Sequence, residues 1–171
     1  MFDYSDLNFI LNLHDLKFIN IDFKRGLGII EDRFILDFVS NNNLISIEVE
    51  TNIRIRDDKS IYLSFNDLYI DKNRKELSVR RYRSQKAIEK TYLSIALEYI
   101  NQTYKNDIVN NIIIKEYGDL YIYLSNNVVI EIFNDTHLDN AVLYRIFQKI
   151  YDKINQYEVT IIKDSITITK S

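Results

Sequence analysis

The segment LISIEVETNIRIR, residues 44–56, alternates two kinds of side chain with unusual regularity. From residue 45 onward the odd-numbered positions carry Ile, Val or Thr, and the even-numbered positions carry Ser, Glu, Asn or Arg. Successive side chains of a β-strand point to opposite faces, so a period of two residues predicts one buried face and one wet face. We therefore predict a long strand over residues 44–56.

The flanking sequence extends this strand into an antiparallel meander. Asp57–Ser60 is typical of a turn, and Ile61, Leu63 and Phe65 continue the buried face on a return strand. Upstream, residues 16–23 and 33–39 have apolar patterns that favour strands, with an Asn-rich loop at residues 41–43. These patterns predict a meander that runs to about residue 71.

Two later segments carry apolar residues at helical spacing. Residues 84–104 form an amphipathic pattern. One stripe runs through Ala87, Thr91, Ile95 and Tyr99, and it is flanked by Ile88, Tyr92, Ala96 and Ile100. In residues 139–157 the same spacing relates Leu143, Phe147, Ile150 and Ile154. We predict a helix for each segment, with a short strand over residues 143–147 as the alternative for the second.

Residues 108–117, 118–135 and 158–169 return to strand-like patterns. We predict an α+β fold in which antiparallel β-meanders form one or two sheets packed with two main helices. The 171 residues suit a single domain over residues 1–171, with a two-part organisation, 1–105 and 106–171, as the alternative. The hexapeptides IYLSFN (61–66) and IYLSNN (122–127) are alike, and coincidence in so Ile- and Asn-rich a chain explains them better than duplication.

The composition narrows the classes of function. Cysteine is absent, which excludes disulfides, thiol nucleophiles and thiolate metal sites. The first six residues carry acids where a signal peptide needs positive charge, and no apolar run approaches the roughly 20 residues of a membrane span. A net charge of −3 argues against a general nucleic-acid binder. We therefore expect a cytoplasmic protein.

Residues that carry catalysis are scarce in this chain. The two histidines, His14 and His137, are far apart and neither has a metal-ligand spacing. The Gly-Leu-Gly at residues 26–28 lacks the further glycine or Gly-Lys-Ser/Thr of a phosphate-binding loop. Glu48 and Glu50 fall on the wet face of a strand beside arginines, as expected for a charge-balanced sheet surface. We expect no enzymatic activity, no cofactor and no metal.

The strongest cluster of positive charge is the segment 72–90. Cations with an interleaved aromatic ring can grip phosphates and stack a base. A nucleic-acid-binding module is therefore an alternative function, and its binding residues would be Arg74, Arg80, Arg81, Tyr82 and Arg83. A solvated connection between a meander and a helix explains the segment better.

The hairpin GDLYIYLSNNVVIEIFND (118–135), followed by YRIF (144–147), resembles a diffuse group of small bacterial proteins. They share GDL, an apolar strand, a Ser-Asn turn, IEIF, acids and an aromatic–Arg pair, and some look like immunity proteins of polymorphic toxins, including toxins exported by type VII secretion. The resemblance covers about residues 108–150. The chain departs from it at Asn127, where Gly is common, and at Tyr144, where Trp is usual.

The resemblance implies a toxin-neutralising protein that binds one protein partner tightly, occludes its active site and does no chemistry. Complementary charge would speed the association, and acids could mimic phosphate toward a nuclease groove. The predicted interface consists of acids and tyrosines: Glu48, Glu50, Asp67, Asp71, Asp135, Asp139, Tyr62 and Tyr69. An inhibitor of a host defence complex, carried by a phage or mobile element, is the alternative with the same surface logic.

Overall fold

The computed structural model describes residues 15–26, 32–40, 43–64, 67, 70, 73, 91–115, 118–133, 142–150, 153–162 and 165–170. One group of strands is β1 (Lys17–Lys24), β2 (Arg33–Ser40), β3 (Asn43–Val49), β9 (Val142–Ile150), β10 (Lys153–Ile162) and β11 (Ser165–Lys170). The other is β4 (Asn52–Arg56), β5 (Ile61–Ser64), β6 (Val109–Ile114), β7 (Leu120–Leu124) and β8 (Val129–Phe133). The helix of the described part is α3 (Tyr92–Thr103).

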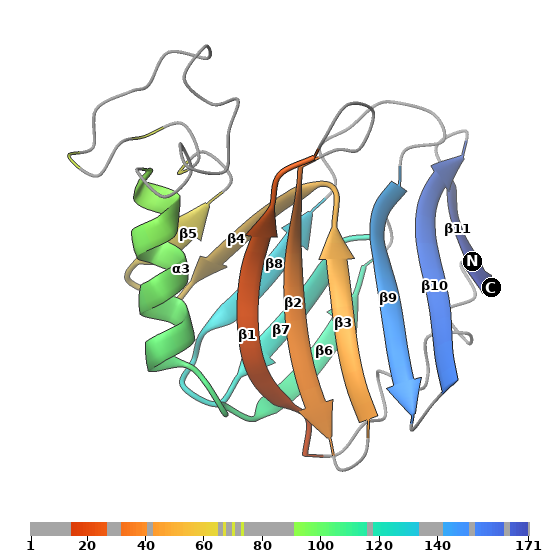
Figure 1. Cartoon of the computed structure of the whole chain (residues 1–171), viewed down its shortest axis with the longest axis horizontal. Helices are drawn as coiled ribbons and strands as arrows, with labels where there is room; N and C mark the ends of the chain where they lie inside the picture. The colour runs from red at the N-terminus through yellow and green to blue at the C-terminus, as the bar shows by residue number, and fades with distance from the viewer. Residues whose placement is uncertain are drawn as a thin grey trace.

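These strands form a sandwich of two antiparallel sheets, with α3 beside β1 and β5 (Figure 1). The six-stranded sheet has the order β1-β2-β3-β9-β10-β11, and the five-stranded sheet has the order β5-β4-β8-β7-β6. Alternating residues of both sheets point inward and join α3 in one apolar core. In β2, for example, Phe34, Leu36 and Phe38 are buried while Ile35 faces outward.

The predicted long strand over residues 44–56 is two strands in two different sheets. β3 ends at Val49 and pairs with β2 and β9, whereas β4 begins at Asn52 and pairs with β5 and β8. The alternation continues across the bend because both sheets bury their odd-numbered side chains in the same core. A strand that crosses from one sheet to the other is typical of sandwich corners, and periodicity alone does not reveal it.

The prediction of a helix over residues 139–157 is wrong, because residues 142–150 and 153–162 are the strands β9 and β10. Tyr144 and Ile146 face the core, and Phe147 and Ile154 lie on the outer face. Apolar residues on both faces of the strand had produced the helical spacing. The fold is therefore mostly β, with two antiparallel sheets and a single short helix in the described residues, in place of the predicted α+β fold with two main helices.

The predicted helix at residues 84–104 is present as α3 in its described part, since residues 84–90 lie outside the described residues. Its buried face agrees only in part with the predicted stripe, of which Thr91, just before α3, is buried. Leu93, Ala96 and Ile100 are buried, while Ile95 and Tyr99 are exposed. α3 lies at the side of the sandwich, so it buries a narrow face. Within the described residues, no helix combines the length and apolar character that a bilayer span requires.

The two sheets repeat one topology. Three consecutive strands are followed by two strands from the other half of the chain, as β1-β2-β3-β9-β10 in one sheet and β6-β7-β8-β4-β5 in the other. A Glu and an Arg lie opposite each other across the third and fourth strands of each repeat, with Glu48 opposite Arg145 and Glu131 opposite Arg54. The hexapeptides at 61–66 and 122–127 are not equivalent in this repeat, because β5 is an edge strand and β7 is an inner one.

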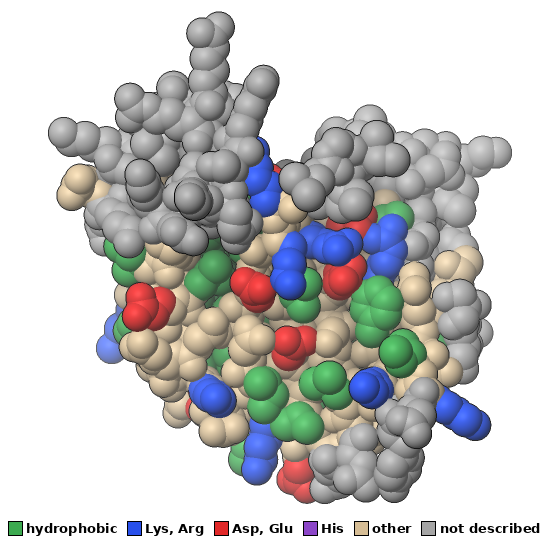
Figure 2. Space-filling view, viewed as in Figure 1, with side chains coloured by type: hydrophobic (Ala, Val, Ile, Leu, Met, Phe, Trp, Pro, Cys, Tyr) green, Lys and Arg blue, Asp and Glu red, His purple; other side chains and the backbone are tan. Residues whose placement is uncertain are grey.

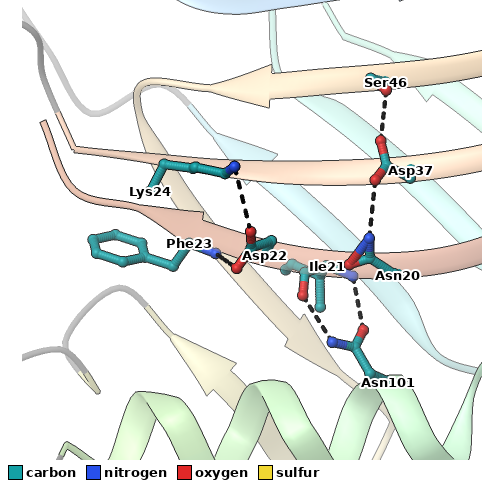
Figure 3. Close-up of polar contacts among 8 residues, drawn as sticks. All are labelled: Asn20, Ile21, Asp22, Phe23, Lys24, Asp37, Ser46 and Asn101. Atoms are coloured by element: carbon teal, nitrogen blue, oxygen red, sulfur yellow. Dashed lines mark hydrogen bonds and ion pairs between the residues drawn. The ribbon is translucent and has the colours of Figure 1, made fainter. Parts of the chain in front are cut away.

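The β1 edge of the six-stranded sheet is closed by α3 and the segment that follows it. The backbone N–H of Ile21 donates to Oδ1 of Asn101 at 2.7 Å, and Nδ2 of Asn101 donates back to the carbonyl of Ile21 at 2.8 Å (Figure 3). Further along the edge, Phe18 exchanges backbone hydrogen bonds with residues 106 and 107. These contacts satisfy backbone N–H and C=O groups of β1 that would otherwise be open to pairing with another strand.

Candidate protein-binding surface

The outer side of the six-stranded sheet carries an apolar patch formed by Val39, Leu44, Phe147 and Ile154. Cross-strand pairing places Val39 beside Leu44, and Lys149 between Leu44 and Ile154. Leu44 is 41% exposed and Ile154 is 64% exposed. We call this outer side the front face, and Figure 2 shows its apolar side chains gathered among charged ones. A mostly apolar cluster on a sheet surface is the kind of feature that marks interaction sites.

A polar network spans β1, β2 and β3 beside the patch. The carboxylate of Asp37 on β2 accepts a hydrogen bond from Nδ2 of Asn20 at 2.9 Å and another from the hydroxyl of Ser46 at 2.5 Å (Figure 3). These bonds tie β1 and β3 to β2 on their solvent side. The network places polar side chains, fixed by hydrogen bonds, beside the apolar patch.

Glu48 and Glu50, which the sequence analysis placed in the interface, lie at one end of the front face. Glu48 forms an ion pair with Arg33 at 3.2 Å, and Glu50 at the corner between β3 and β4 pairs with Arg145. Both acidic side chains are largely covered. They therefore present a mixed charged rim to a partner.

Tyr62 and Asp67 lie elsewhere, at the β5 edge of the other sheet. The Tyr62 hydroxyl donates to Asp57 Oδ2 at 2.5 Å, and its ring packs against those of Tyr99 and Tyr104, with centroids 5.6 and 5.7 Å away. Asp67 accepts a hydrogen bond from the backbone N–H of Ser64. The predicted residues Asp71, Asp135, Asp139, Tyr69, Arg74, Arg80, Arg81, Tyr82 and Arg83 lie outside the described residues.

The Asp57–Tyr62 hydrogen bond predicts a pH effect on stability. The Tyr62 hydroxyl and the N–H groups of Lys59 and Ser60 hold the pKa of the Asp57 carboxyl below its usual range. A carboxyl whose folded pKa is depressed contributes stability above its unfolded pKa of about 3.9, and loses it as the pH falls through the folded pKa. We expect Asp57→Asn to be less stable than the wild type at pH 7 and the difference to shrink below about pH 4.

Thermal unfolding from pH 7 to pH 2 measures this difference. Asp58→Asn removes the same charge from the neighbouring position and serves as the control. An Asp57→Asn deficit that stayed constant across the whole range would contradict the role of the ionised carboxylate.

The outer side of the five-stranded sheet has a different composition. Glu131 on β8 is only 2% exposed, although it points away from the core. Its Oε2 accepts from Nε of Arg54 at 2.6 Å, and its Oε1 accepts from Nε and Nη2 of Arg56 at 2.9 and 2.8 Å. The carboxylate raises the pKa of the Arg56 guanidinium further above its usual range, chiefly through these hydrogen bonds.

Cation–aromatic contacts flank this triad. The Arg54 guanidinium lies 5.5 Å from the centroid of the Phe133 ring, and Nζ of Lys115 lies 4.2 Å from that of Tyr121. We call the side that carries Arg54, Arg56, Glu131, Tyr121 and Phe133 the back face. The sequence analysis did not identify this cluster, because Arg54 and Glu131 are 77 residues apart. Its one sequence signal is the repeated Ile-Glu and Arg-Ile pattern of the two sheets.

Among the residues that the structure describes, no three His, Cys, Asp or Glu side chains are grouped so that they could hold a metal ion. Comparisons with protein-family models, with curated proteins and with solved structures found no match to this chain. The surface chemistry of the two faces is therefore the feature of the chain that bears on its function.

Proposed function

We propose that this chain is a protein-binding inhibitor whose front face covers a functional surface of a partner protein. The observation that supports this function is the apolar patch, in which Leu44 and Ile154 stay exposed at the surface of the six-stranded sheet. Burying exposed apolar surface drives association, and a preformed sheet loses little conformational entropy when it binds. The partner class we propose is a bacterial toxin, as the resemblance to immunity proteins implies.

The arrangement of the front face suits binding by occlusion. An apolar centre with a polar, charged rim is the usual anatomy of a protein interface. The rim pairs Arg33–Glu48 and Arg145–Glu50 would orient the partner, since charge complementarity contributes more to specificity and association rate than to affinity. The phosphate-mimic mechanism has less support, because these two acids are paired with arginines.

The function is tested by affinity capture of a partner from nuclease-treated lysate of the source cells, with washes at low and high salt. We expect one stoichiometric protein that survives high salt, and we expect the purified chain to inhibit that protein's activity. Capture of nucleic acid, or of a mixture that high salt removes, would favour the nucleic-acid-binding alternative through the segment 72–90.

The binding surface is tested with the double variant Leu44→Asp/Ile154→Asp. We expect at least about tenfold weaker binding of the captured partner, because two charges would be buried in the apolar centre of the interface. Ile61→Asp is the matched control, since Ile61 is 60% exposed but lies on β5 of the other sheet. If the double variant bound as tightly as Ile61→Asp, the front face would not be the interface.

A further inference from the structure

The back face offers two guanidinium groups that are held in place and still accessible. Arg54 and Arg56 are 40% and 37% exposed at their side chains, whereas the Glu131 carboxylate between them is buried. Arg54 uses Nε to reach Glu131. Within the described part of the chain, no acceptor is hydrogen-bonded to either Nη atom of Arg54. The buried carboxylate therefore orients both arginines and leaves the Nη donors of Arg54 directed away from it. Arg56 is more fully engaged, because its Nη1 also donates to the carbonyl of Asp57 at 3.5 Å.

We propose that the back face is a second docking surface that binds a carboxylate on an acidic segment of a protein partner. The planar guanidinium group matches a carboxylate through two parallel N–H donors. Because Glu131 already holds both side chains, part of the ordering cost of binding is removed before the partner arrives.

The ring contacts favour this occupant over a single-stranded nucleic acid. Bases bind such sheets by stacking on open aromatic faces. Here Lys115 lies over Tyr121 and Arg54 lies over Phe133, so cations already occupy ring faces. Each ring that stacks on a cation also fixes the position of that cation on the surface.

The charge balance also favours this occupant. Glu131 offsets one of the arginines, and Asp58 lies close enough to Arg56 to act on it electrostatically. The remaining excess of positive charge is small. It suits one or two carboxylates better than a phosphate chain, whose affinity depends on neutralising many charges.

The two faces carry corresponding Glu and Arg positions in the repeated topology. Glu131 and Arg54 on the back face occupy the places that Glu48 and Arg145 occupy on the front face. The two faces point away from each other on opposite sides of the sandwich (Figure 1). A partner on the front face therefore leaves the back face open, and this second surface does not depend on the proposed function.

The test measures binding of a fluorescein-labelled hexaglutamate peptide by fluorescence anisotropy at low ionic strength. We expect Arg54→Gln/Arg56→Gln to bind at least about tenfold more weakly than the wild type. Removing both arginines leaves Glu131 buried without a cation, so we also use the triple variant Arg54→Gln/Arg56→Gln/Glu131→Gln, in which no buried charge remains unpaired. We expect the same loss from the triple variant, with a cooperative unfolding transition.

Arg33→Gln/Arg145→Gln is the matched control, because it removes the same charge from the front face. Retained binding in this control, together with the loss in the back-face variants, would support the proposal. Equal losses in both sets, or no binding of hexaglutamate to the wild type, would overturn it. Tighter binding of a labelled hexathymidylate that also depends on Arg54 and Arg56 would likewise overturn it, in favour of a nucleic-acid surface.

Discussion

Ile146→Ala should lower the free energy of unfolding by about 3 kcal/mol, because a large aliphatic side chain is removed from a packed core. Ile146 is fully buried on β9, where its neighbours across the sheet are Ile47 and Tyr157. Ile154→Ala, on the next strand of the same sheet, should change the free energy by less than about 0.5 kcal/mol. Ile154 is mostly exposed on the front face.

Urea denaturation of the two variants measures this contrast through the midpoint and the slope. Comparing these two variants also distinguishes the observed strands from the helix predicted for residues 139–157. In that helix Ile154 would lie on the buried stripe with Leu143, so its truncation would be the costly one. A larger effect for Ile154→Ala than for Ile146→Ala would contradict the sandwich.

Local patterns predicted those strands whose two faces differ. The strand at residues 33–39 and the hairpin at residues 118–135 are present as β2 and as β7 with β8. The Asp57–Ser60 turn is present and closes with a hydrogen bond from the backbone N–H of Asp57 to the carbonyl of Ser60. In the predicted turn of the 118–135 hairpin, Asn127 has φ of 60°, a conformation that asparagine tolerates better than most residues.

Long-range pairing could not be predicted in the same way. The bend between β3 and β4 preserves the alternation, and only the partners β9 and β8 show that two sheets are present. In β9, an apolar residue on the wet side, Phe147, disguised the period of two. The predicted fold class was therefore wrong because a strand with apolar side chains on both faces was assigned as a helix.

The candidate surfaces show the same contrast between local patterns, which were predictable, and long-range strand pairing, which was not. Alternation placed Glu48 and Glu50 off the core face, but their pairing with Arg33 and Arg145 depends on strands that meet only in the folded sheet. The apolar patch of the front face was missed because Ile154 was assigned to the buried stripe of a predicted helix, and because only strand pairing brings Leu44 beside Val39. Glu131 is buried beneath two arginines of a neighbouring strand that lies far away in the sequence.

Asn101→Asp should lower the free energy of unfolding by about 2 kcal/mol, through the edge of the six-stranded sheet. The change is nearly isosteric and keeps an oxygen to accept the N–H of Ile21. It replaces the Nδ2 donor with an oxygen that faces the carbonyl of Ile21, so one hydrogen bond becomes a repulsion. The new charge also lies in the last turn of α3, where a negative group opposes the helix dipole.

Gln102→Glu is the matched control, since it makes the same amide-to-acid change at the neighbouring, exposed position of α3. We expect it to cost about 0.5 kcal/mol, from the dipole and from repulsion with Glu98. Below about pH 4 the carboxyl that Asn101→Asp introduces becomes protonated and can again donate to the Ile21 carbonyl. The Asn101→Asp deficit should therefore narrow in acid, and hydrogen exchange at the Ile21 amide should slow with it. Equal deficits in the two variants, with no rescue in acid, would mean that the Asn101 amide does not hold α3 against the β1 edge.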